Sequence, residues 1–143
     1  MTEIKKILCP VEFGDGTTNK VVEWAAGATK AFAGELLLIN VIPQFDEYSK
    51  VASSGEFLHE IGSLAHRNME NLLKKDLFKE IKVTGKIISG PPAQAIIDTA
   101  KTEKVDMIVM GTHGRAGVEK FLFGSVAQKV VQHSEIPVLT LKP

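Results

Sequence analysis

The chain has 143 residues, of which 44% are hydrophobic and 24% charged, which suits one domain with a substantial core. Its 17 basic residues balance 17 acidic ones, which argues against nucleic acid or an anionic membrane as a partner, because both usually require a basic face. No apolar run approaches the length of a membrane span, and the single cysteine cannot form an internal disulfide. We therefore expect a reducing, cytoplasmic location.

Short apolar runs alternate with amphipathic stretches along the whole chain. The runs end in turn-forming residues and predict strands buried on both faces. The stretches repeat apolar residues every three or four positions and predict helices. In chain order, we expect a strand at 7–11, a helix from about 17 to 33, a strand at 36–41, a surface loop from 42 to about 55, a helix at 57–73, a strand at 82–89, a helix at 93–103, a strand at 106–110, a helix at 125–134 and a strand at 137–141.

Two helix ends carry local signals. The first helix should end near Ala33-Gly34, because glycine often terminates helices, and Phe32 continues its apolar spacing. The second proline of Gly90-Pro91-Pro92 suits the first turn of the third helix.

Two kinds of side chain are expected to have no special role. Lysines such as Lys6 are most simply solvated. Cys9 lies in a predicted buried strand without a CxxC partner and is expected to be inert.

Alternating strands and helices predict one α/β domain over residues 1–143, with a mostly parallel sheet. Right-handed crossovers place helices on both faces, giving a three-layer α/β/α sandwich. Ligands of such folds bind beyond the carboxyl ends of the strands, where the strand order reverses. The local pattern does not determine that order.

A glycine-rich stretch follows the predicted strand at 106–110 and runs from Gly111 to Gly124-Ser125. Glycines let a ligand approach the backbone closely, and successive N–H groups in such a loop can hold an anion. Ser125 stands where a helix should begin and is suited to cap it, and the start of a helix favours phosphate. Arg115 would add a charged contact. The alternative is a connecting loop whose glycines only make turns.

The spacing of this stretch is more specific than its glycine content. Gly111, two residues, Gly114, nine residues and then Gly124-Ser125 resembles the ATP-binding motif of the universal stress protein family. The stretch is neither a Walker A loop nor a dinucleotide fingerprint. The resemblance covers nearly the whole chain and implies a Rossmann-like fold with strand order 3-2-1-4-5, ATP as the ligand, and Mg²⁺ or Mn²⁺ on its phosphates.

The resemblance also implies the rest of the nucleotide site. Glu12 replaces the usual Asp, which keeps a ribose acceptor but shifts its reach; the alternative is a solvated loop acid. Val41 and Met110 would line the adenine slot, or fill the core, or do both. The predicted nucleotide-binding residues are Pro10, Val11, Glu12, Val41, Met110, Gly111, His113, Gly114, Arg115, Gly124, Ser125 and Val126.

No catalytic or metal-binding protein group is predicted. His113 lies in the loop with no carboxylate nearby in sequence, so it is expected to offer a backbone N–H rather than act as a general base. His59, His66 and His133 have no spacing typical of zinc ligands.

The last strand is expected at a sheet edge, where Val138–Leu141 would leave backbone groups unpaired. Antiparallel pairing with a second copy would satisfy them, and the family resemblance favours the same homodimer. The alternative is a monomer whose edge is blunted by Lys142 and Pro143.

The resemblance thus implies an ATP-binding, dimeric stress-response module that signals to a protein partner. The alternatives are a slow ATP hydrolase and an interaction module that binds no nucleotide. No residue pattern supplies a clear base for hydrolysis, and the retained glycine motif speaks against the second alternative.

Overall fold

The computed structural model of the chain describes residues 3–14, 17–43, 55–112 and 123–142. It contains all the predicted strands and helices, with ends that differ by one or two residues, and adds a short 3₁₀ helix that the sequence pattern did not predict. The elements are β1 (Lys6–Pro10), α1 (Thr17–Ala31), β2 (Glu35–Ile42), α2 (Gly55–Leu73), η2 (Asp76–Phe78), β3 (Lys82–Ser89), α3 (Pro92–Thr102), β4 (Met107–Gly111), α4 (Ser125–His133) and β5 (Val138–Leu141).

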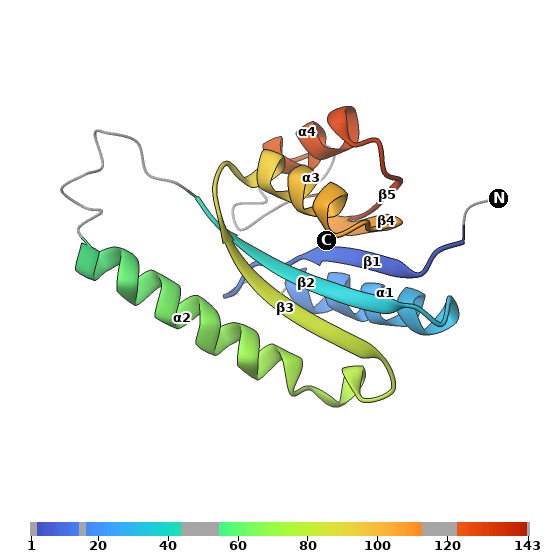
Figure 1. Ribbon diagram of the computed structural model, residues 1–143, viewed down its shortest axis with the longest axis horizontal. Coiled ribbons are helices and arrows are strands. Elements are labelled where there is room, and N and C mark those ends of the chain that lie inside the picture. The colour runs from blue at the N-terminus through green and yellow to red at the C-terminus, as the bar shows by residue number, and fades with distance from the viewer. Residues whose placement is uncertain (1–2, 15–16, 44–54, 113–122, 143) are drawn as a thin grey trace.

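The five strands form one sheet in the order β3-β2-β1-β4-β5, and every neighbouring pair is parallel (Figure 1). Leu8 of β1 lies at the centre, with Leu37 of β2 on one side and Ile108 of β4 on the other. The strand order expected from the family resemblance is therefore confirmed. Because β1 pairs with both β2 and β4, the order reverses next to β1.

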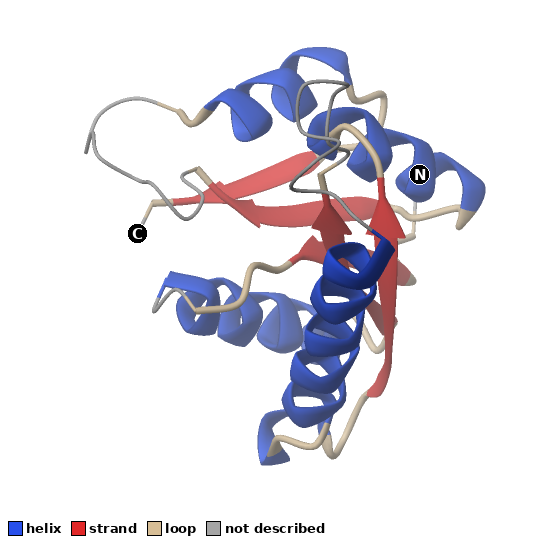
Figure 2. Cartoon of the chain, turned by 90° about the vertical axis from the view of Figure 1, so that its left-hand side faces the viewer, coloured by secondary structure: helices blue, strands red, loops and turns tan. Residues whose placement is uncertain are grey.

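Helices cover both faces of the sheet (Figure 2), and each face has its own apolar core. One core joins α1 and α2 to the sheet, and the other joins α3 and α4 to the opposite face. Cys9 is fully buried in the first core, as predicted. Burial raises the pKa of its thiol to about 12, because the thiolate would lose its hydration. The thiol therefore stays protonated at neutral pH.

The helices α1 and α3 end in the same way. In α1 the Gly34 N–H donates to Thr29 O and the Ala33 N–H donates to Lys30 O, which is the Schellman arrangement. In α3 the corresponding donors are Val105 and Lys104. The left-handed position of each motif is occupied by a residue with a Cβ, Ala33 at φ 53° and Lys104 at φ 55°.

The helix α1 was predicted to end near Ala33-Gly34, and the residue with the left-handed conformation is Ala33. Gly34 is needed for another reason: a Cβ at this position would lie 2.6 Å from Lys5 O. Phe32, which was expected to continue the packed stripe, lies beyond the last residue of α1 and is 48% exposed. The helix ends before its apolar periodicity does.

Replacing Lys104 with glycine should stabilise the protein by about 1 kcal/mol, because a left-handed conformation costs an L-residue about that much. Urea unfolding should show a raised midpoint. The matched control is Lys101→Gly within α3, which should lower stability by about 1 kcal/mol. A lower midpoint for Lys104→Gly would contradict the strained conformation.

A network of charges lies where the strands begin. Lys6 Nζ lies 3.2 Å from Glu103 and 3.6 Å from Glu35, and its side chain is largely covered, so the expectation that it is simply solvated is wrong. Glu103 also pairs with Lys86, and these two lysines hold the pKa of its carboxyl below the ordinary value. Asp106 accepts hydrogen bonds from the backbone N–H groups of Lys5 and Lys6. The network ties β1 to β2, β3 and the turn after α3.

The two edges of the sheet differ in charge. The edge strand β3 carries Lys82 and Lys86, which is typical of an edge protected from further pairing. The edge strand β5 has the sequence Val-Leu-Thr-Leu and carries no charge.

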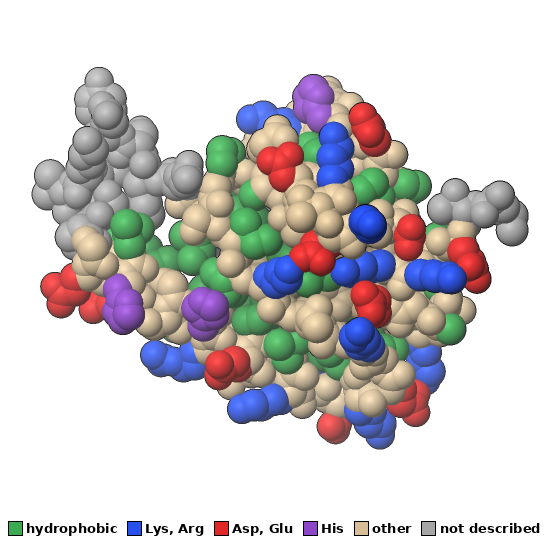
Figure 3. Space-filling view, in the orientation of Figure 1, with side chains coloured by type: hydrophobic (Ala, Val, Ile, Leu, Met, Phe, Trp, Pro, Cys, Tyr) green, Lys and Arg blue, Asp and Glu red, His purple; other side chains and the backbone are tan. Residues whose placement is uncertain are grey.

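The described surface of the molecule has no face of a single charge in the view of Figure 3, where acidic and basic side chains intermingle. Among the described residues, no helix is long and apolar enough to cross a membrane.

Candidate functional site

The candidate site lies at the edge of the sheet where β1 and β4 end. The crossover from β1 leads to α1 on one face, and the one from β4 leads to α4 on the other. The ends of β1 and β4 therefore lie at the point of strand reversal, where open α/β sheets usually bind a ligand; we call this place the crevice. Figure 2 looks toward this edge.

The end of β1 is held by its neighbour β2. Val11 is buried, and its N–H donates to Ile39 O at 2.8 Å. The side chain of Asn40 donates from Nδ2 to Val11 O at 2.9 Å. Both backbone groups of Val11 are thus fixed, and the next residue, Glu12, is exposed at the mouth of the crevice. Pro10, the last residue of β1, is half-buried.

A hydrogen bond holds the two ends of the segment between β4 and α4 close to each other. Thr112 is buried, and its N–H donates to Leu141 O of β5 at 2.9 Å. Its carbonyl accepts a hydrogen bond from the Gly124 N–H at 2.6 Å. These bonds place Gly111, at the end of β4, close to the first residue of α4. His113, Gly114 and Arg115 lie outside the described residues.

The start of α4 differs from the expected capping arrangement. The capping position is Gly124, with φ −64° and ψ 160°, and Ser125 is the first helical residue. No side chain makes a capping hydrogen bond here, so the prediction that Ser125 caps the helix is wrong. The first turn of any helix has N–H groups without partners in the helix and a partial positive charge. This end of α4 therefore suits an anion.

Three predicted residues belong to the core on one face of the sheet. Val41 of β2 and Val126 of α4 are half-buried and pack against the same core cluster that contains Met110 of β4. Met110 is buried, so its core-packing role is confirmed. All three side chains therefore belong to the apolar layer on the side of the sheet covered by α3 and α4. Val11 belongs to the core on the opposite face.

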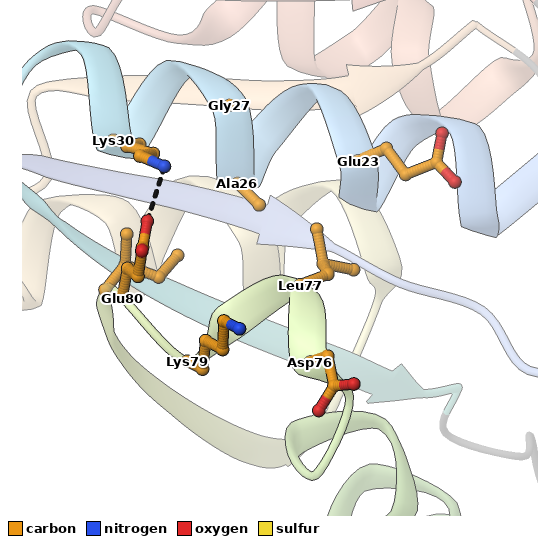
Figure 4. Close-up of a pocket in the computed structure, with 9 residues that line it drawn as sticks. Glu23, Ala26, Gly27, Lys30, Asp76, Leu77, Lys79 and Glu80 are labelled. Carbon is orange, nitrogen blue, oxygen red and sulfur yellow. Dashed lines mark hydrogen bonds and ion pairs between the residues drawn. The ribbon is translucent and has the colours of Figure 1, made fainter.

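A hollow of about 340 Å³ lies elsewhere, between α1 and η2 (Figure 4). Ala26 and Gly27 line it from α1, and Lys30 forms an ion pair with Glu80 at its side. Its walls adjoin the start of β3, at the opposite end of the strands from the crevice. Among the described residues, no three His, Cys, Asp or Glu side chains gather as a metal-binding group.

The sequence model of the universal stress protein family matches residues 3–142. The chain belongs to this family. The match spans every strand and helix of the fold.

Two archaeal relatives agree with this assignment. Universal stress protein MJ0531 of Methanocaldococcus jannaschii is 33% identical over 96% of this chain and 82% of its own length. Universal stress protein MJ0577 of the same organism is 34% identical over 96% of this chain and 94% of its own length. The solved structure of MJ0577 superposes with a TM-score of 0.74 and covers 99% of this chain and 98% of that one.

Two more distant structures share the fold. A universal stress protein in complex with cAMP has a TM-score of 0.73 and 19% identity, and covers 98% of both chains. The one from Archaeoglobus fulgidus in complex with dAMP has a TM-score of 0.71 and 17% identity, over 99% of this chain and 100% of that one. At these identities the similarity establishes the fold alone.

Two residues that shape this site were not predicted from the sequence. Asn40 holds the end of β1, and Thr112 joins β4, β5 and α4 through its backbone. Asn40 did carry a signal, because it interrupts an otherwise apolar buried strand, and a polar residue there needs a partner. Thr112 carried none, since its role lies in backbone groups that every residue has.

Replacing Asn40 with alanine should lower stability by about 1 kcal/mol, because Val11 O loses its side-chain donor. Chemical denaturation measures this effect. The matched control is Asn71→Ala on the exposed side of α2, which should change stability by less than about 0.5 kcal/mol. Equal effects of the two substitutions would show that the Asn40 hydrogen bond contributes nothing.

Proposed function

We propose that this chain is an ATP-binding regulatory protein that works as a homodimer and signals its nucleotide state to a protein partner. ATP would occupy the crevice between β1 and β4, with Mg²⁺ or Mn²⁺ on its phosphates. A cytoplasmic location, inferred from the single cysteine, belongs to the same proposal.

The observation that carries the proposal is the junction of β4 and α4. The hydrogen bond from Gly124 to Thr112 brings the two ends of the glycine motif together. It sets the N-terminus of α4 at the carboxyl edge of the sheet, where helix N–H groups and dipole favour phosphate. The motif glycine Gly114 belongs to the same segment, and we assign its backbone to the phosphates.

The other described residues fit the remaining parts of an adenine nucleotide. Val41, Met110 and Val126 pack in the same apolar core and would supply the apolar surface that a nucleotide base requires. Glu12, exposed where β1 ends, would accept a hydrogen bond from the ribose. Two proteins with this fold have been solved in complex with cAMP and dAMP, which supports an adenine nucleotide as the class of ligand.

Calorimetric titration with ATP and Mg²⁺ tests the proposal. The variant Ser125→Ala tests whether the Ser125 hydroxyl contacts a phosphate. The parent protein should bind ATP more tightly than millimolar. Ser125→Ala should bind about tenfold more weakly if the hydroxyl contacts a phosphate. Its unfolding midpoint should not fall, because this side chain makes no capping bond in the structure.

Ser134→Ala is the matched control at the other end of α4. Ser134 Oγ donates to Ile136 O and accepts from the Ile136 N–H. Its removal should lower stability and leave ATP affinity unchanged. Binding of ATP by the parent that is weaker than millimolar would remove the basis of the proposed function.

The homodimer is proposed to form through β5. Within the described chain, β5 pairs with β4 on one side and with no strand on the other. An uncharged edge strand such as β5 can pair with a strand of another chain, whereas the lysines of β3 disfavour such pairing at the other edge. Antiparallel pairing of two β5 strands would make one continuous sheet with a two-fold axis. Sedimentation analysis should show a dimer, and a monomer at all concentrations would refute it.

A further inference from the structure

The β5 strand is too short to hold a dimer by itself. It has four residues, whereas a stable interface buries roughly 1,000 Å² or more in total. Elements that flank the strand must therefore contribute to the proposed homodimer, and the inference below rests on that proposal.

A large apolar side chain lies on one of the flanking elements. Trp24 is the only tryptophan of the chain, and it is 55% exposed on α1. Tryptophan is usually much more buried than this in a monomer, and it is enriched at the centres of interfaces. The exposure of Trp24 therefore indicates a surface that a partner covers.

The side of α1 that carries Trp24 faces β5. Lys20, one helical turn earlier and on the same side of the helix, donates from Nζ to Lys142 O just after β5. The opposite flank of α1, which includes Ala26 and Lys30, lines the hollow beside η2 (Figure 4). Trp24 thus lies on the flank of α1 that is turned toward β5 and away from η2.

The sheet surface on that side is also apolar. Leu141 packs against the core beneath α1, whereas Val138 packs against the core on the opposite face. Side chains alternate along a strand, so Leu139 points to the same side as Leu141. It is paired in register with Val109 of the α1-side core and is 37% exposed. Trp24 and Leu139 are therefore two exposed apolar side chains on the α1 side of the sheet, and we call them the strip.

We propose that a second copy of this chain covers this strip, so that Trp24 of each subunit is part of the dimer interface. A two-fold axis normal to the sheet places both α1 helices on the same side of the joined sheet. The two strips then adjoin across the β5–β5 seam, and the tryptophans close the space above it. This arrangement supplies the apolar area that four strand residues lack.

The single tryptophan makes the proposal directly measurable. Iodide quenching of its fluorescence should decrease as protein concentration rises, in parallel with dimer formation followed by sedimentation. Trp24→Ala should raise the dimer dissociation constant at least tenfold. The matched control is Leu64→Ala on α2, which is 53% exposed and should leave the constant unchanged.

The variant Leu139→Lys separates the proposed pairing of β5 strands from the proposed role of Trp24. It should abolish the dimer and leave Trp24 fully quenchable at every concentration, while circular dichroism confirms that both variants fold. If Leu139→Lys abolishes the dimer but quenching is the same in monomer and dimer, the Trp24 inference fails and β5 pairing stands. A parent protein that stays monomeric, or a dimer that survives Leu139→Lys, overturns both.

Discussion

Gly34→Ala should destabilise the protein by about 3 kcal/mol, the upper end of the usual overpacking cost. A Cβ at this position would lie 2.6 Å from the carbonyl oxygen of Lys5 and 3.0 Å from its carbon. These are backbone atoms, and the same oxygen accepts the Glu35 N–H that starts the β1–β2 pairing. No side-chain rotation can relieve the contact, so the start of both strands must shift. Urea unfolding followed by circular dichroism measures the loss.

Gly27→Ala provides a matched control of opposite sign. Gly27 lies inside α1, and a Cβ there would meet nothing within 4 Å. Alanine should therefore stabilise the helix by up to about 1 kcal/mol. If both substitutions changed stability in the same direction, the close approach of Gly34 to Lys5 would not be the reason for its glycine.

Gly124→Val should reduce ATP affinity at least 100-fold, a loss of about 2.7 kcal/mol, while the protein remains folded. The backbone of Gly124 is extended, with φ −64° and ψ 160°, a conformation that valine adopts readily. The branched side chain would stand at the N-terminus of α4, where the proposed phosphate approaches the N–H groups. Calorimetric titration measures affinity, and thermal unfolding reports the fold.

Two further variants test whether the loss of ATP affinity is specific to the glycine motif. Gly114→Val in the same motif should have the same effect on ATP binding. Gly55→Val introduces the same side chain at the first residue of α2, where a Cβ meets nothing within 4 Å, and should leave affinity unchanged. Normal ATP binding by Gly124→Val would rule out the proposed position of the phosphates.

The sheet and its helices were predictable because their residues obey simple periodicities. Runs such as Leu36–Ile39 are apolar at every position because both faces of the sheet are covered. The order of the strands needed the family resemblance, because residue patterns report burial and not which strand is the neighbour. The 3₁₀ helix at Asp76–Phe78 has one buried residue, Phe78, which gives no periodicity to detect.

The candidate site was predictable where it rests on glycine spacing and was missed where it rests on long-range contacts. Gly111 and Gly124 were identified from the motif, and the structure brings the ends of their segment together. The bond from Asn40 to Val11 and the pairing of Lys6 with Glu103 join residues distant in sequence, so no local pattern encodes them. Ser125 was misassigned by one position, since glycine also occupies capping positions.

The anchoring of Thr112 has a consequence for the segment that follows it. Its N–H is held by Leu141 and its carbonyl by Gly124, so both ends of segment 113–123 start from one fixed point of the framework. The entropy of closing a loop grows only with the logarithm of its length, about 0.6 kcal/mol per doubling. Segments of different length and sequence can therefore be grafted between Thr112 and Gly124 at little cost to folding, and such grafts would change the ligand of the proposed site.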